Sequence, residues 1–351
     1  MPCRESERPI VIAHRGASGY MPEHTLAAYA LAIEMGADFI EPDLVMTRDG
    51  VLVARHENEI SGTTDVADRP EFASRRTEKT IDGIPGEGWF TEDFTLAELK
   101  TLRAKERLPL IRSASRWLDG FFPIPTLAEV LDLARGTDCR FHLQAERQGE
   151  AECRCVGVYP EIKHPTYFAG LGLAMEEPLV KQLRGAGFSR ETAKAFIQCF
   201  EVGSLKRLRK MTDLPLMQLL DVTGGPHEPE AEGDPRTWAD LVKPEGLAEI
   251  ASYADGIAAN KGLMIPRDVD DSLGAPTSLV DDAHAAGLIV HGWTFRAENC
   301  FLPTDFRSVG GAADAGDLEG ELATFLALGM DGFFTDQPNI GVRARDAFVT
   351  R

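Results

Sequence analysis

Short apolar runs alternate with amphipathic stretches along most of the chain, and this alternation restricts its fold more than any other feature. The runs are rich in β-branched residues, and the stretches between them repeat apolar residues at helical spacing, as Leu26, Tyr29 and Ile33 do. Eight strands alternating with helices is the count of a (β/α)8 barrel. We therefore predict an α/β fold, a (β/α)8 TIM barrel. The candidate strands are 9–14, 37–44, 156–163, 195–200, 214–220, 254–260, 287–294 and 329–336.

A ninth apolar run, 51–56, follows Asp49-Gly50. Asp-Gly between two extended runs is typical of a hairpin turn, so this run is predicted to extend the second strand rather than to form a barrel strand. Residues 59–122 show no strand–helix rhythm and are rich in Gly, Pro, Thr and charge. Because a typical barrel has about 250 residues, we predict one domain, 1–351, with an inserted cap subdomain at about 59–122.

The charge balance excludes several classes of partner. The chain has 351 residues, with 37 Lys and Arg against 56 Asp and Glu, a net charge of −19. Phosphate backbones and anionic membranes are bound by clustered basic residues, so neither is expected as a broad partner. A small anionic substrate needs only local positive charge and remains compatible. Nothing in the sequence predicts the oligomeric state.

The ends and the cysteines give weaker expectations. No run of about 18 apolar residues predicts a transmembrane helix, so no stable membrane insertion is expected. The first residues contain no apolar core of a signal peptide, which indicates the cytoplasm for the chain as written and the periplasm if a signal was trimmed. The cysteine spacing fits no zinc pattern, and free thiols are favoured over a Cys139–Cys153 disulfide.

Polar side chains follow the apolar part of most candidate strands. Catalytic residues of a TIM barrel sit at the C-terminal ends of its strands, so these residues form the candidate site. They are His14 and Arg15 after the first strand, Glu41 and Asp43 on the second, His56 on its extension, Glu161 and Lys163 on the third, Gln198 on the fourth, Trp293 and Arg296 at the seventh, and Asp336 at the eighth.

Three of these residues suit a divalent cation. Glu41 and Asp43 are two residues apart on a strand, so both point to one face, and their charges repel unless a cation lies between them. With Glu161 they form an all-oxygen site typical of Ca²⁺ or Mg²⁺. Glu146 is an alternative third ligand, but it lies on an irregular, charged segment. An isolated Glu-x-Asp is more often a surface pair, so the prediction depends on the whole set.

The remaining residues suit phosphodiester cleavage. His14 and His56 can exchange protons near neutral pH, and Arg15 and Lys163 can bind a phosphate. Gln198, Trp293 and Arg296 are possible pocket residues. We assign the other histidines mostly to solvent, loops or core, although His291 is expected close to the barrel mouth. These are His24, His142, His164, His227, His284 and His291.

Taken together, these motifs resemble the glycerophosphodiester phosphodiesterase family. Residues 12–29 resemble its HRG…PENT opening, and residues 39–60 resemble its E-x-D…T-x-D-G…H-D block. The likeness covers most of 10–342, and the long insertion looks most like the bacterial, periplasmic-type branch. It implies metal ligation by Glu41, Asp43 and Glu161. It also implies acid–base roles for His14 and His56 and phosphate contacts from Arg15 and Lys163.

The resemblance also implies the reaction and shows two departures. A neighbouring glycerol hydroxyl attacks phosphorus, releases the head-group alcohol and leaves a cyclic phosphate that water opens to glycerol 3-phosphate; which histidine is the acid stays open. His24 stands where the family usually has Asn, and Glu57 stands where Asp is commoner.

Two other functions remain compatible with the same barrel. One is a phospholipase D-type enzyme acting on lysophospholipids or sphingomyelin, which needs an exposed apolar patch for the acyl chain. Aromatic residues of the 59–122 segment are candidates for such a patch, although burial is favoured for them: Trp89, Phe90, Trp117, Phe121 and Phe122. The other is a barrel that binds a phosphorylated ligand without turnover, which would not need two proton carriers.

Overall fold

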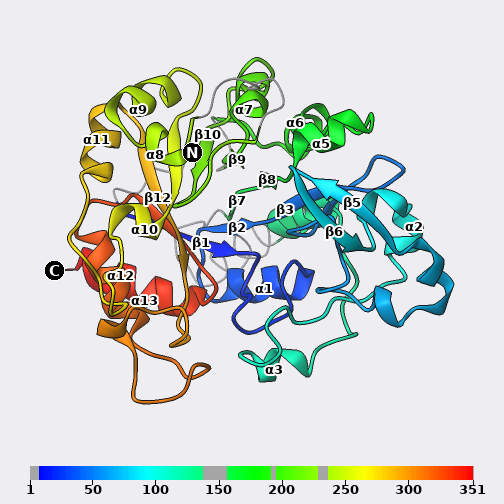
Figure 1. Cartoon of the computed structure of the whole chain (residues 1–351), viewed down its shortest axis with the longest axis horizontal. Helices are drawn as coiled ribbons and strands as arrows, with labels where there is room; N and C mark the ends of the chain where they lie inside the picture. The colour runs from blue at the N-terminus through cyan, green and yellow to red at the C-terminus, as the bar shows by residue number, and fades with distance from the viewer. Residues whose placement is uncertain (1–7, 137–155, 191–194, 228–235, 351) are drawn as a thin grey trace, which may run out of the picture.

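The computed structural model describes residues 8–136, 156–190, 195–227 and 236–350, and its main body is a closed ring of parallel strands surrounded by helices (Figure 1). β1 pairs in parallel with both β2 and β13, and the remaining neighbours follow in chain order around the ring. The predicted (β/α)8 fold is therefore confirmed. The ring strands are β1 (Ile10–His14), β2 (Phe39–Glu41), β3 (Asp43–Met46), β7 (Gly157–Val158), β8 (Glu161–Ile162), β9 (Ile197–Cys199), β10 (Leu216–Leu220), β11 (Gly256–Asn260), β12 (Ile289–Phe295) and β13 (Gly332–Thr335).

Two of the eight predicted strands are interrupted by proline. Pro42 separates β2 from β3, and Pro160, with Tyr159, separates β7 from β8. Proline has no N–H to donate to the neighbouring strand, so the regular ladder breaks at each position. β2 pairs with β7 and β3 with β8, so the second and third strands stay side by side across the breaks. Their C-terminal halves begin with Asp43 and Glu161, which are partners in register.

The helices cover the outside of the ring (Figure 1). Val11 and Ala13 of β1 belong to the large core between strands and helices, whereas Ile12 points into the ring with Tyr159 and Phe334. This alternation follows from the two-residue period of a strand. The helices are α1 (Leu26–Glu34), 127–136, α5 (Pro165–Gly170), α6 (Glu176–Gly185), α7 (Val202–Arg209), α8 (Trp238–Leu241), α9 (Pro244–Ile250), α10 (Lys261–Met264), α11 (Leu279–Ala285), α12 (Leu318–Leu326) and α13 (Pro338–Val349), with the 3₁₀ turn η5 (Thr304–Phe306).

The predicted hairpin after the second strand is confirmed. β4 (Leu52–Ala54) pairs antiparallel with β3, and Gly50 has a φ of 77° in the turn between them. This positive φ is a conformation that glycine adopts without steric cost. The hairpin returns the chain toward the barrel mouth, where His56 follows β4.

The 59–122 segment contains more regular structure than its sequence indicated. An antiparallel hairpin, β5 and β6, turns at Asp82-Gly83, so the same dipeptide signal that marked the first hairpin was missed here. The segment lies to the side of the ring (Figure 1). Its elements are η1 (Val66–Asp68), η2 (Pro70–Arg75), β5 (Thr77–Ile81), β6 (Ile84–Gly88), η3 (Thr91–Asp93), α2 (Leu96–Leu99) and α3 (Ser113–Arg116).

The aromatic residues singled out in this segment divide into buried and exposed ones, with Phe122 half-buried between them. Trp89 and Phe90 are buried, as favoured from the sequence. Trp117 and Phe121 are 85% and 69% exposed, so the expected burial is wrong for these two. They lie next to the short helix α3 and in the turn that follows it.

The structure also bears on the remaining expectations. Every helix among the described residues is too short or too polar to cross a membrane. Cys199 and Cys300 are free thiols. Cys139, Cys153 and Glu146 lie outside the described residues.

Candidate active site

All of the predicted site residues except Asp336 line a single cavity of about 750 Å³ at the C-terminal ends of the ring strands. Their side chains come from β1, β2, β3, β8, β9 and β12 and from the residues that follow β1, β4, β8 and β12. Parallel strands end on the same side of the ring, which explains why residues far apart in sequence meet there. The predicted residues in the lining are His14, Arg15, Glu41, Asp43, His56, Glu161, Lys163, Gln198, Trp293 and Arg296.

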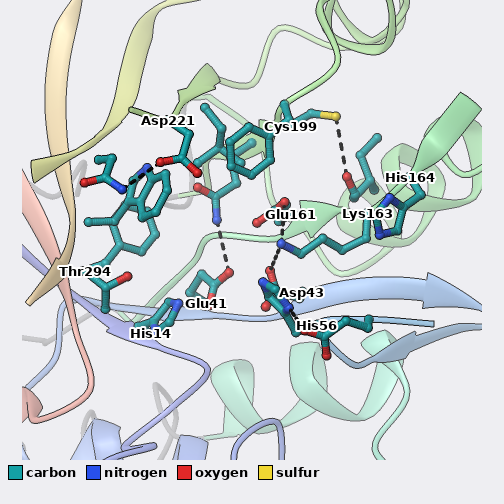
Figure 2. Close-up of a pocket in the computed structure, with 18 of the residues that line it drawn as sticks. His14, Glu41, Asp43, His56, Glu161, Lys163, His164, Cys199, Asp221 and Thr294 are labelled. Carbon is teal, nitrogen blue, oxygen red and sulfur yellow. Dashed lines mark hydrogen bonds and ion pairs between the residues drawn. The ribbon is translucent and has the colours of Figure 1, made fainter. Parts of the chain in front are cut away.

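Three carboxylates form the centre of the cavity (Figure 2). Glu41, Asp43 and Glu161 are buried, and one oxygen from each lies within 4.8 Å of the others. Glu41 is the last residue of β2 and Asp43 the first of β3, so both reach the same side of the ring around Pro42. These residues are the three that the sequence predicted as a cluster.

Cationic and amide groups surround these carboxylates. Lys163 Nζ lies 2.8 Å from Glu161 Oε1 and 3.4 Å from Asp43 Oδ1. The Arg15 backbone N–H donates to Glu41 Oε2 at 2.8 Å, and its guanidinium Nε lies 3.3 Å from Asp43 Oδ2. Gln198 Nε2 donates to Glu41 Oε1 at 3.1 Å. The two predicted phosphate-binding cations therefore lie beside the carboxylates.

The protonation tendencies of the three carboxyl groups test whether a cation fits here. Burial, with Asp43 and Glu161 nearby, raises the pKa of Glu41 well above its ordinary value. Burial and the Asp43 charge, opposed by Lys163, raise the pKa of Glu161 to about 8. The Asp43 carboxyl is also buried, but Lys163 and other cations hold its pKa well below the usual range. Crowded oxygen donors that tend to retain protons are the donor set that a hard divalent cation neutralises, so the residues fit such an ion.

Each predicted proton carrier has a carboxylate on its Nδ1 atom. His14 Nδ1 lies 2.6 Å from Asp336 Oδ1, and His56 Nδ1 lies 2.5 Å from Glu57 Oε1. Burial, reinforced by Arg15, lowers the pKa of His14 to about 4, and burial with Arg15 and Lys163 lowers that of His56 to about 3. In both cases the partner carboxylate opposes this lowering. Glu57 therefore contacts His56 directly, although its side chain is longer than that of Asp.

His24 replaces the family's usual Asn with a buried hydrogen-bonding group. Its Nε2 lies 2.9 Å from Asp43 Oδ2, and its Nδ1 lies 2.7 Å from the Tyr29 hydroxyl. The residue has a φ of 53°, a left-handed conformation in which His is enriched among non-glycine residues. His24 therefore supports a carboxylate of the cluster, although its sequence position had been read as loop or core.

The other histidines correct part of the sequence reading. His291 is buried inside the ring, where its Nδ1 lies 2.9 Å from the Tyr159 hydroxyl, which agrees with its assignment to the core. His164 and His227 do line the cavity, although neither was singled out. His142 lies outside the described residues.

Four residues that hold the site together have no role in the sequence-based prediction. Asp336 was noted as a strand end, but Glu23, Arg107 and Arg112 were not singled out. Arg15 NH1 donates to Glu23 Oε2 at 3.1 Å, and Arg107 binds both Glu23 and Glu57. Asp336 accepts from Arg112 and Arg296. No local pattern marks the arginines, because they come from a segment without strand–helix periodicity.

Comparison with known proteins places this cavity in a family. A model of the Glycerophosphoryl diester phosphodiesterase family matches residues 14–340. The chain belongs to this family. A glycerophosphodiester phosphodiesterase of Arabidopsis thaliana is 37% identical over 346 residues, which cover 95% of this chain and 84% of the relative. The predictions of the family and of an enzyme of this class are therefore confirmed, and the periplasmic-type branch stays a prediction.

Solved structures of the family share the fold. A glycerophosphoryl diester phosphodiesterase structure from Silicibacter pomeroyi has a TM-score of 0.62 at 21% identity and covers 97% of this chain and 95% of its own. A phosphodiesterase of Oleispira antarctica, in complex with the product sn-glycerol-3-phosphate, has a TM-score of 0.58 at 21% identity, with 97% of each chain covered.

Proposed function

We propose that this chain hydrolyses glycerophosphodiesters, such as glycerophosphocholine or glycerophosphoethanolamine, to glycerol 3-phosphate and an alcohol, with a divalent metal ion and two histidines. The observation that carries the proposal is the cluster of Glu41, Asp43 and Glu161 with His14 and His56 beside it in one cavity (Figure 2). The family membership and the product bound by the Oleispira antarctica structure support it. The proposal treats 1–351 as one domain with 59–122 as its cap.

The three carboxylates would hold the ion, Ca²⁺ or Mg²⁺. Such an ion stabilises negative charge on phosphoryl oxygens and lowers the pKa of a hydroxyl that it contacts. Arg15 and Lys163, which already lie beside the carboxylates, would bind the phosphate oxygens and orient the diester. This local positive charge offsets the acidity of the chain as a whole, so an anionic substrate is compatible with a net charge of −19.

The two histidines would exchange the protons. One imidazole accepts the proton of the neighbouring glycerol hydroxyl as its oxygen bonds to phosphorus. The other donates a proton to the head-group oxygen as its bond to phosphorus breaks, which releases the alcohol and a cyclic glycerol phosphate. Water then opens the ring with the two roles reversed and yields glycerol 3-phosphate. The carboxylates on Nδ1 leave each Nε2 as the nitrogen that meets the substrate.

Removal of metal tests this proposal directly. Release of glycerol 3-phosphate from glycerophosphocholine is measured before chelation, after excess EDTA, and after Ca²⁺ or Mg²⁺ is added back separately. We expect activity to fall to background with EDTA and to return with one ion more than with the other. Full activity in protein shown by elemental analysis to be metal-free would contradict the metal requirement.

The alternative, a phospholipase D-type enzyme acting on lysophospholipids or sphingomyelin, is tested by substrate choice. Trp117 and Phe121 are exposed, as an acyl-binding surface would require, but neither lines the cavity. We therefore expect a higher kcat/KM on glycerophosphocholine than on lysophosphatidylcholine. The reverse preference would favour the alternative. Tight binding of glycerophosphocholine without any product would favour the non-catalytic barrel.

A further inference from the structure

We infer that the 59–122 segment positions both proton-carrying histidines, because Arg107 and Arg112 each bind the carboxylate that holds the Nδ1 atom of one of them. We call the two chains of contacts the Arg112–Asp336–His14 relay and the Arg107–Glu57–His56 relay. The inference rests on the proposed function, in which both histidines exchange protons with the substrate. Arg107 and Arg112 are positioning residues, since each acts through a carboxylate.

The Arg112–Asp336–His14 relay crosses from the segment to the last strand of the barrel. Arg112 NH2 donates to Asp336 Oδ2 at 2.5 Å, and the other oxygen of Asp336 lies 2.6 Å from His14 Nδ1. Arg112 is itself fixed, because its Nε donates to Glu298 Oε1 at 2.7 Å and its NH1 to the Ser18 carbonyl at 2.9 Å. The side chains of Arg112 and Asp336 are 6% and 3% exposed, so water competes little for these contacts.

The Arg107–Glu57–His56 relay begins five residues earlier in the same segment. Arg107 NH1 and NH2 donate to the two oxygens of Glu57 at 2.9 and 2.7 Å, and Glu57 Oε1 lies 2.5 Å from His56 Nδ1. Arg107 also donates to both oxygens of Glu23, at 2.8 and 2.6 Å. A planar guanidinium with two bidentate partners has one orientation that satisfies both, so it fixes the plane of the Glu57 carboxylate.

Asp336 and Glu57, the carboxylates between arginine and histidine in the two relays, are both expected to be ionised. Burial alone would raise the pKa of Asp336, but Arg296, Arg112 and His14 hold it well below the ordinary value. The pKa of Glu57 is also lowered against the effect of burial, first by His56 and then by Arg107. An ionised carboxylate only accepts hydrogen bonds, so each histidine donates from Nδ1 and turns Nε2 to the cavity, where the base accepts the substrate proton and the acid carries the proton that it donates.

An ion pair elsewhere in the segment provides a matched control. Arg75 binds the two oxygens of Glu98 at 3.0 and 2.5 Å, and both side chains are about as exposed as that of Arg107. Among the described residues, neither of the two is hydrogen-bonded or ion-paired with a histidine, and neither lines the cavity. Arg75→Met therefore removes a bidentate pair of the same segment without touching either relay, and it measures what a structural tie alone contributes.

The first test reads the histidine tautomers without any turnover. ¹⁵N-histidine NMR spectra of the full chain are compared for wild type, Arg107→Met, Arg112→Met and Arg75→Met at pH 7. We expect the Nδ1–H form of both histidines in wild type and a mixture of tautomers at His56 in R107M and at His14 in R112M, with R75M unchanged. Wild-type tautomers in R107M and R112M would overturn the inference. Arg107→Lys and Arg112→Lys replace any methionine variant that does not fold.

The second test uses kinetics on two leaving groups. For glycerophosphocholine we expect kcat of R107M and R112M to fall by about 10- to 100-fold with little change in KM, a part of the 10²–10⁴ that acid–base catalysis contributes. A nitrophenyl ester of glycerol phosphate needs no proton on its leaving group. One of the two variants disturbs the histidine that protonates the leaving group, and the nitrophenyl ester should restore the rate of that variant. The rate of the variant that disturbs the other histidine should stay low. An equal loss on both esters in both variants, or a comparable loss in R75M, would overturn the inference.

The two tests separate this inference from the proposed function. If wild type shows no turnover of any glycerophosphodiester but the tautomers shift as expected, the proposed function fails and the relays stand. If wild type is active and neither the tautomers nor kcat respond to R107M and R112M, the relays fail and the proposed function stands.

Discussion

The barrel and the 59–122 segment contribute to the cavity in different ways. The barrel strands, the β3–β4 hairpin and the residues at their ends supply every predicted ligand, cation and proton carrier, whereas the described part of the segment adds only Asp82 and Ile84 to the lining. The segment instead contacts the site indirectly, because Arg107 binds Glu57 and Arg112 binds Asp336. Strand ends hold reactive groups because the ring fixes their positions, and the segment is proposed to fix the orientation of groups that the ring leaves free to rotate.

The largest effect is expected when either proton-carrying histidine is removed, because these residues are the barrel's contribution to catalysis. His14→Ala and His56→Ala should each lower kcat on glycerophosphocholine by about 10²- to 10⁴-fold, the usual contribution of acid–base catalysis. Circular dichroism and thermal unfolding provide the control for folding. A wild-type rate in either folded variant would show that this histidine does not transfer a proton. Another group in the cavity would then have to do so.

The carboxylate cluster predicts a pH-dependent metal affinity. The pKa of Glu161 is raised to about 8 in the absence of metal, so below that pH the ion must displace a proton. Displacement of the Glu161 proton alone should lower the affinity by about tenfold for each pH unit below 8, and binding should release protons. Titration calorimetry in two buffers of different ionisation enthalpy measures that release. Asp43→Asn is the control that should abolish binding, and a pH-independent affinity would contradict the assignment.

The barrel interior holds a buried histidine that predicts a pH-dependent stability, whereas the 59–122 segment contains no histidine. Burial lowers the pKa of His291 to about 4 from an ordinary 6.5. Between these values the unfolded chain binds more protons, so this residue makes the protein less stable as the pH falls from 6.5 to 4, by about 3 kcal/mol. Denaturant unfolding of wild type and His291→Gln should show a steeper loss in wild type. Parallel curves would show that His291 is not the responsible group.

The smallest effect is expected at the exposed aromatic residues of the segment. Trp117→Ser and Phe121→Ser remove side chains that are mostly in water, so the free energy of unfolding should change by no more than about 0.5 kcal/mol. Activity on glycerophosphocholine should stay at the wild-type level, since neither residue lines the cavity. A large loss of activity would mean that this surface communicates with the site and would weaken the contrast drawn between the two regions.

The sequence predicted the barrel well because its evidence is local. Apolar runs, helical periodicity and the Asp49-Gly50 turn each depend on a few neighbouring residues, and they gave the strands and the first hairpin. The breaks at Pro42 and Pro160 and the hairpin at Asp82-Gly83 had equally local signals that were not used. Exposure of Trp117 could not be read in this way, because burial depends on which distant residues cover a side chain.

The amino-acid sequence by itself determined the (β/α)8 architecture and ten of the residues that line the cavity, because parallel strands in a ring end on one side and bring their last residues together. Only the tertiary structure decided which groups hold those residues. Asp336 lies 322 residues from His14 and 224 from Arg112, and Arg107 lies 50 from Glu57. No periodicity or spacing links positions so far apart, since these contacts exist only after the chain has closed the barrel and packed the segment against it.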